Sequence, residues 1–128
     1  DLIRALHKAG AGPQIELLEL SSYGAATKSS GHVEIKKDIT DNVTGRDILL
    51  VDDILESGRT LSFAKDMLLD RGAKSVKLCV FLNKSGKRKV DIESEFVGFE
   101  CPDLFVVGYG LDYAHYFREL PYVGSLES

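Results

Sequence analysis

The chain has 128 residues, with 16 Lys and Arg against 20 Asp and Glu, so its formal net charge is −4. This length suits one domain, residues 1–128, and an apolar share of 44% is ordinary for a folded protein and argues against disorder. An acidic chain is a poor candidate for binding nucleic acid, and no apolar stretch approaches the roughly 20 residues that a membrane span needs. Two cysteines, Cys79 and Cys101, fit neither a disulfide framework nor a zinc motif, which favours a reducing cytoplasm.

Apolar spacing predicts the first elements. An amphipathic helix begins at the first residues and ends at the Gly- and Pro-containing stretch 10–13. Because the chain opens with Asp1 inside this helix and lacks an initiator Met, we expect the functional protein to have further residues before Asp1. Residues 14–20 are predicted to form a strand, residues 21–31 a long polar loop of the kind that often forms a lid, and residues 32–36 an exposed strand.

The middle of the chain predicts a βαβ unit. Residues 48–51 are a continuous apolar run, typical of a strand covered on both faces. Residues 60–71 have apolar positions at helical spacing, Gly72 ends this helix, and residues 76–82 form a second buried strand. A strand, a helix and a strand in about 35 residues imply a parallel sheet, so the predicted fold class is α/β.

The last third is less regular. Residues 96–99 and 104–107 are predicted as short strands, and an aromatic and polar stretch over residues 112–120 ends at Pro121.

The segment ILLVDDILESGRTL, residues 48–61, carries the clearest functional pattern. An apolar strand ends in two acids, Asp52 and Asp53, which can accept hydrogen bonds from sugar hydroxyls. Two adjacent acids repel by about 1–4 kcal/mol at 4 Å, depending on the dielectric, so structure alone has little reason to keep both. In open α/β sheets, ligands bind beyond the carboxyl ends of the strands.

The loop after the acids leads into the predicted helix. A helix N-terminus offers N–H groups and a partial positive charge, which suit a phosphate. Gly58 lets the backbone approach closely, and Ser57 and Thr60 add hydroxyl donors. The whole segment therefore predicts a site for a phosphorylated sugar. The structural alternative is a solvated turn in which Ser57 caps the helix.

The same segment resembles the signature of the type I phosphoribosyltransferases. A second block, FVGFECPDLFVVGYGLDYAHYFRELPYVG, resembles the C-terminal part of hypoxanthine–guanine phosphoribosyltransferases and is specific to the 6-oxopurine enzymes. A third block, LSSYGAATKSSG, resembles the mobile loop of the bacterial members. The resemblance covers essentially the whole chain. It implies a mainly parallel central sheet flanked by helices, with a mobile lid loop, in a phosphoribosyltransferase domain that is incomplete at its N-terminus.

The resemblance implies how the sugar phosphate is held. Asp52 and Asp53 would bind the ribose 2′- and 3′-hydroxyls. Four consecutive residues would hold the 5′-phosphate: Ser57, Gly58, Arg59 and Thr60. Arg118 would approach the pyrophosphate. Two residues would belong to the lid: Ser22 and Tyr23.

It also implies how the purine and a metal are held. Lys84 would lie against the purine O6, Phe105 would stack on the ring, and Val106 would bind it through its backbone. Asp112 would border the purine and bind a magnesium ion. Glu56 occupies the position at which the family usually has Asp, a position implicated in proton transfer at the purine N7.

Without the resemblance, these residues have plainer interpretations. Lys84 heads a basic cluster of the kind that usually forms a solvated turn, and the other members are Lys87, Arg88 and Lys89. Phe105 and Val106 could be core residues. Asp112 and Arg118 could pair across a helical stretch.

The expected function is a magnesium-dependent step of purine salvage. The enzyme would transfer the 5-phosphoribosyl group from phosphoribosyl pyrophosphate to hypoxanthine, with guanine as a second candidate base, giving IMP or GMP and pyrophosphate. Two alternatives stay open: a regulatory protein that senses phosphoribosyl pyrophosphate without catalysis, and a sibling transferase for another base. We expect a homodimer or homotetramer, with neither nucleic acid nor a membrane as a partner.

Overall fold

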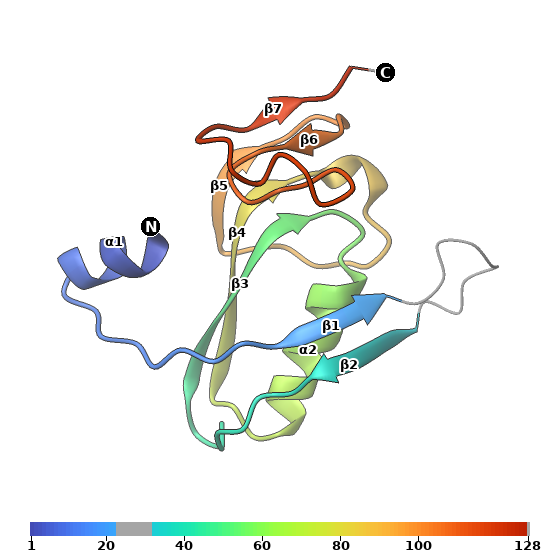
Figure 1. Ribbon diagram of the computed structural model, residues 1–128. Helices are drawn as coiled ribbons and strands as arrows, with labels where there is room; N and C mark the ends of the chain where they lie inside the picture. The colour runs from blue at the N-terminus through green and yellow to red at the C-terminus, as the bar shows by residue number, and fades with distance from the viewer. Residues whose placement is uncertain (23–31, 128) are drawn as a thin grey trace. The chain divides into compact units, whose positions relative to one another are not determined.

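The computed structural model describes residues 1–22 and 32–127, which fall into two compact units, Asp1–Asn42 and Val43–Ser128 (Figure 1). Compact units can belong to one domain, so the single-domain prediction stays a prediction. None of the helices in the described ranges is long and apolar enough to cross a membrane.

The first unit holds a helix and a two-stranded sheet. Helix α1 (Leu2–Lys8) confirms the predicted helix and is followed by Gly10, whose φ is +87°. Strands β1 (Glu19–Ser22) and β2 (Val33–Lys37) pair antiparallel.

The predicted bounds of the first strand were wrong. It begins at Glu19 rather than at residue 14, and it extends to Ser22, inside the predicted loop. Pairing explains the shift, because β1 covers only the residues that lie opposite β2. Ile15 and Leu17 are apolar but solvent-exposed, so their side chains add no packing that would hold a longer strand in this unit.

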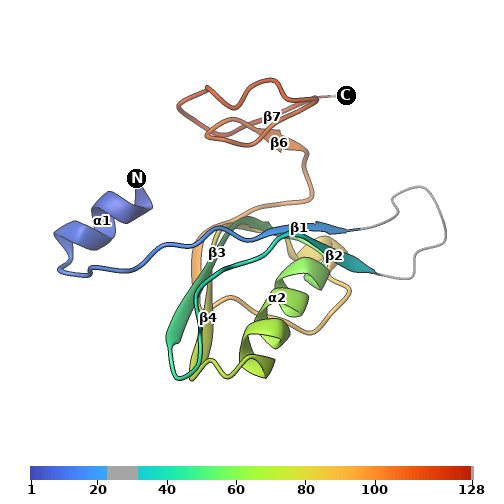
Figure 2. The same cartoon turned by 60° about the horizontal axis from the view of Figure 1, so that its bottom comes forward.

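The second unit is built on a parallel sheet, which confirms the predicted βαβ unit. Strands β3 (Asp47–Leu55), β4 (Ser75–Asn83) and β5 (Phe96–Glu100) lie side by side in that order and all run parallel (Figure 1). Helix α2 (Arg59–Asp70) connects β3 to β4 and lies along one side of them (Figure 2).

The core of this unit lies between α2 and the sheet. Three residues of α2 are buried: Leu61, Ala64 and Leu68. A cluster of buried residues joins helix α2, strands β3 and β4 and the loop after β4: Leu55, Leu61, Leu78, Val80 and Ile92. Burying apolar area of this kind is the main favourable term in folding.

Strand β3 departs from its prediction in two ways. Within this unit it is covered on one face only, because Leu49 is 40% exposed and Val51 is 52% exposed. It also continues to Leu55, so Asp52 and Asp53 lie inside the strand rather than at its end. The reason is pairing with β4, which extends through the acids to the end of both strands.

The C-terminal part consists of turns around a short antiparallel pair, β6 (Val106–Val107) and β7 (Gly124–Ser125). The predicted strand over residues 96–99 is confirmed, because these residues lie in β5. Of the second predicted strand, residues 104–107, only residues 106–107 form a strand. No helix forms over residues 112–120; isolated bridges and residues with positive φ, such as Phe117, turn the backbone there.

Candidate functional site

The carboxyl ends of the three parallel strands meet at one edge of the sheet. The Lys84 N–H, just after β4, donates to the Leu55 carbonyl at the end of β3, over 2.9 Å. The Cys101 N–H, just after β5, donates to the Asn83 carbonyl at the end of β4, also over 2.9 Å. Residues that follow the strands are thereby held together, at the edge where open α/β sheets bind ligands.

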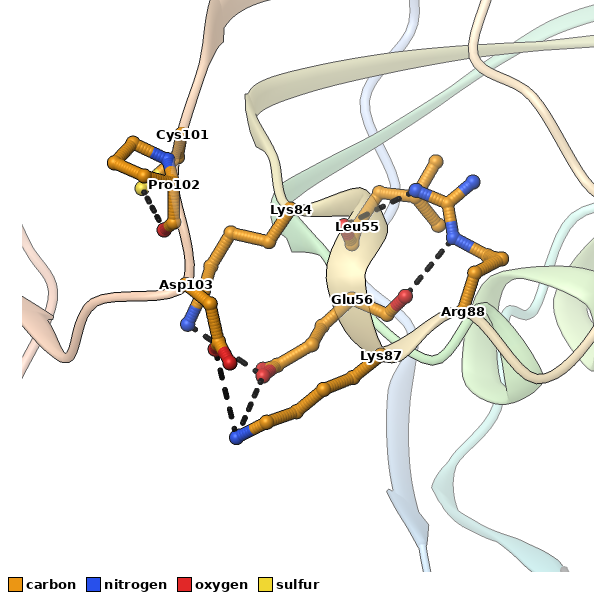
Figure 3. A network of polar contacts seen from close by, with 8 residues as sticks. All are labelled: Leu55, Glu56, Lys84, Lys87, Arg88, Cys101, Pro102 and Asp103. Atoms are coloured by element: carbon orange, nitrogen blue, oxygen red, sulfur yellow. Dashed lines mark hydrogen bonds and ion pairs between the residues drawn. The ribbon is translucent and has the colours of Figure 1, made fainter.

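An acidic and a basic side chain meet at this edge (Figure 3). The Lys84 ammonium lies 3.5 Å from Glu56 Oε1, and Lys84 is only 7% exposed. Lys87 lies 3.9 Å from the same oxygen and 3.6 Å from Asp103 Oδ1. A buried ammonium is costly without a partner, and Glu56 supplies one for Lys84. The interpretation of Lys84 as part of a solvated turn is wrong.

The four residues predicted to hold a phosphate form the turn into α2. Gly58 has a φ of +85° and is the N-cap, so the alternative in which Ser57 caps the helix is wrong. The Ser57 hydroxyl oxygen instead accepts a weak bond, over 3.3 Å, from the Arg59 N–H. The first turn of any α-helix has N–H groups without intrahelical acceptors, and here Thr60 belongs to that turn.

The two adjacent acids have different environments. Asp52 is partly buried and Asp53 is exposed. Asp52 Oδ1 accepts a hydrogen bond from the Asp53 N–H over 2.9 Å, and Asp53 Oδ1 accepts one from the Ile54 N–H over 2.7 Å. Burial, and secondly the negative charge of Asp53, raise the pKa of Asp52 to about 6. Such a shifted group is typical of functional sites.

The predicted purine-contacting residues of the C-terminal part lie around β6. Phe105 is 54% exposed, and its ring meets the Tyr113 ring edge to face, with 5.8 Å between the centroids. The alternative of a core residue is therefore wrong for Phe105. Val106 is half-buried and lies opposite Ser125 in the β6–β7 pair.

Asp112 and Arg118 form an ion pair over 3.2 Å, across a turn and not across a helix. Asp112 Oδ2 also accepts a hydrogen bond from the His115 N–H over 2.8 Å. Arg118 donates a second bond, over 2.6 Å, to the Gly110 carbonyl. The contacts seen in the described residues do not join this pair to Glu56 and Lys84.

The two predicted lid residues lie at the edge of what is described. Ser22 is the last residue of β1 and lies opposite Val33. Tyr23 lies outside the described residues.

Arg88 is a residue that the sequence interpretation missed. Its Nε donates to the Glu56 carbonyl over 2.9 Å (Figure 3). A terminal nitrogen donates to Asn83 Oδ1 over 2.5 Å and lies 3.5 Å from the Leu55 carbonyl oxygen. Its other terminal nitrogen donates to the Ile92 carbonyl over 2.6 Å. Within a run of basic residues no local signal separates Arg88 from its solvated neighbours.

Comparisons with known proteins identify the family of this chain. A family model for the phosphoribosyl transferase domain matches residues 2–114. The hypoxanthine-guanine phosphoribosyltransferase of Bacillus subtilis is 52% identical over 89% of this chain and 63% of its own length. The Aquifex aeolicus protein of the same name is 47% identical over 99% of this chain and 70% of its own length.

A solved structure of the Trypanosoma cruzi hypoxanthine phosphoribosyl transferase superposes with a TM-score of 0.92, at 35% identity. The match covers 98% of this chain and 65% of that one. The matched part of this chain spans 63% of the length of the Bacillus subtilis relative, which is less than two thirds.

Proposed function

The chain belongs to the phosphoribosyltransferase family and has its α/β fold, and on that premise we propose that it serves the transfer of a 5-phosphoribosyl group from phosphoribosyl pyrophosphate to hypoxanthine. Guanine is the second candidate base. The products would be IMP or GMP, and pyrophosphate. This is a purine-salvage reaction.

The observation that carries the proposal is the pairing of Glu56 with Lys84. In a 6-oxopurine, O6 and N7 are neighbours on one edge of the base. An ammonium can donate to O6, while a carboxylate can accept a proton or a hydrogen bond at N7. The two side chains lie 3.5 Å apart, so one purine edge can meet both at once. Glu56 would then move the N7 proton, and Lys84 would stabilise charge at O6.

The strand and turn that precede Glu56 suit the ribose phosphate. Asp52 and Asp53 would accept hydrogen bonds from the ribose 2′- and 3′-hydroxyls. The turn into α2 would hold the 5′-phosphate with backbone N–H groups and hydroxyls, through four residues: Ser57, Gly58, Arg59 and Thr60. Fixing the sugar in this way orients its C1 for attack by the base.

The C-terminal part would complete the base site. Phe105 presents an exposed ring on which a purine can stack, and the Val106 backbone would bind the base. Arg118 would approach the pyrophosphate. Ser22 and Tyr23 as lid residues, a homodimer or homotetramer, and a cytoplasmic location stay predictions.

The residues present fit a magnesium ion at Asp112. In residues 1–22 and 32–127, no group of three or more His, Cys, Asp or Glu could hold a metal ion. Magnesium in phosphate-transfer sites is commonly held by one or two carboxylates together with substrate oxygens and waters, so a cage of protein ligands is not required. Asp112 offers a carboxylate whose side chain is 30% exposed. A bound magnesium ion would neutralise charge on the departing pyrophosphate.

Release of pyrophosphate from phosphoribosyl pyrophosphate and hypoxanthine tests the proposal. Lys84→Ala should lower kcat/KM for hypoxanthine about 5–150-fold, because a charge-assisted hydrogen bond is lost. This fold-change corresponds to a loss of about 1–3 kcal/mol in transition-state stabilisation. The KM for phosphoribosyl pyrophosphate should change far less. Lys89→Ala is the matched control, because Lys89 is an exposed lysine on the same segment. Equal losses for both substrates would indicate a structural role for Lys84.

Glu56→Gln tests the proton-transfer role separately. It keeps the shape and removes the titrating group, so turnover should fall about 10²-fold while nucleotide affinity holds within a few fold. Glu56→Asp should be milder, because the carboxylate remains. Turnover of Glu56→Gln at the native rate would refute the role.

A further inference from the structure

The loop between β3 and α2 is held by a second segment, residues 84–92. Three consecutive carbonyls at the end of β3 and in the loop accept bonds from this segment: Leu55, Glu56 and Ser57. The Leu55 carbonyl accepts from the Lys84 N–H, and the Ser57 carbonyl accepts from the Lys89 N–H over 2.8 Å. The carbonyl between them depends on a side chain, Arg88, over 2.9 Å.

Arg88 joins three parts of the second unit through one planar guanidinium. Besides Glu56 in the loop, it binds Asn83 at the end of β4 and the Ile92 carbonyl. Ile92 is buried in the core cluster, so the guanidinium connects the loop to the core. A lysine has no planar fork and could not reach three acceptors in these directions.

These bonds orient the loop peptides. In a planar trans peptide the N–H points away from the C=O of the same peptide unit. Carbonyls 55–57 point toward residues 84–92, so the N–H groups of residues 56–58 point away from them. This is the orientation in which the loop offers its N–H groups to an anion.

We propose that Arg88 is a positioning residue that fixes the loop so that its N–H groups face the 5′-phosphate and Glu56 stays beside Lys84. This inference rests on the proposed function. In this role Arg88 acts through the Glu56 carbonyl and Asn83 and not by binding a substrate itself. The phosphate-holding turn and the base-binding lysine are thereby coupled through one side chain.

The test uses Arg88→Ala and Arg88→Lys, with Lys89→Ala as the matched control. Titration calorimetry with IMP reports a ligand that carries both a 5′-phosphate and the base. Both Arg88 variants should bind IMP about tenfold or more weakly than the native protein, because charge-assisted bonds are lost. The control should bind as the native protein does. Added guanidinium ion should restore part of the affinity of Arg88→Ala and none of that of the control.

A ligand-free readout separates the positioning role from the proposed function. In NMR spectra, Arg88→Lys should shift the backbone amides of residues 56–58, whereas Lys89→Ala should leave them in place. If Arg88→Ala fails to fold, Arg88→Lys decides the outcome alone. Native IMP affinity and unshifted amides in Arg88→Lys would overturn the inference. Failure of the native protein itself to bind IMP would overturn the proposed function and, with it, the phosphate role of Arg88.

Discussion

Asp52 allows a direct test of how far the adjacent acids Asp52 and Asp53 lower the free energy of unfolding. Burial and the charge of Asp53 raise the pKa of Asp52 from 3.8 to about 6. A carboxyl whose pKa is higher in the folded than in the unfolded chain binds its proton more tightly when folded. The free energy of unfolding therefore falls as the pH rises from 3.8 to about 6, and the full cost is present above that window.

Asp52→Asn removes this cost at nearly constant size. A shift of about two pKa units corresponds to about 3 kcal/mol, which is an upper limit near pH 7. Part of the shift comes from Asp53, and the asparagine oxygen can still accept the hydrogen bond from the Asp53 N–H. We expect Asp52→Asn to raise the free energy of unfolding by about 1–2 kcal/mol near pH 7 and to leave it unchanged near pH 3.5.

Urea unfolding at both pH values measures the effect, with equal m-values as the check that only stability has changed. Asp53→Asn is the matched control. It should give a smaller gain, because it removes only the repulsion and leaves Asp52 buried. IMP should bind more weakly to Asp52→Asn if the carboxylate holds a ribose hydroxyl. A variant that is less stable than the native protein near pH 7, or equally stabilised at both pH values, would refute the reasoning.

Two further predictions concern stability. Glu95 Oε2 accepts a hydrogen bond from the Leu78 N–H over 2.6 Å, and this bond lowers the pKa of Glu95 from 4.5. Glu95→Ala should therefore lower the free energy of unfolding by about 0.5–1 kcal/mol near pH 7, as measured by urea unfolding. The difference in stability between the native protein and Glu95→Ala should shrink as the pH falls below 4.5 and through the lower pKa of Glu95 in the folded protein. A difference that stays constant with pH would argue against a hydrogen bond to the charged carboxylate. Gly58→Ala should lower stability by about 1–3 kcal/mol in thermal unfolding, because φ is +85° and the added Cβ would lie 2.6 Å from Ile92 Cγ2. Gly86→Ala, whose Cβ would meet its nearest atom at 3.8 Å, should change little, and equal losses in the two variants would contradict this reason.

The sequence by itself determined the features that depend on local pattern. Apolar spacing over about three turns located α2, and the buried residues Leu61, Ala64 and Leu68 confirm its inward face. A strand, a helix and a second strand in close succession required a parallel sheet, and β3, α2 and β4 form one. The segment of residues 48–61 was also sufficient to predict a turn that leads into a helix N-terminus, and the turn at Gly58 leads into α2.

Only the tertiary structure decided features that depend on segments far apart in the chain. Glu56 and Lys84 are 28 positions apart, and they meet because β3 and β4 pair in a parallel register that ends both strands at the same edge. The same pairing extends β3 through Asp52 and Asp53 to Leu55, although its apolar run ends at residue 51. Arg88 has the same local pattern as the lysines beside it, and only packing brings its guanidinium to the Glu56 carbonyl, 32 positions away. Local pattern specifies which face of an element is apolar, but contacts between elements depend on register and packing, which no single segment encodes.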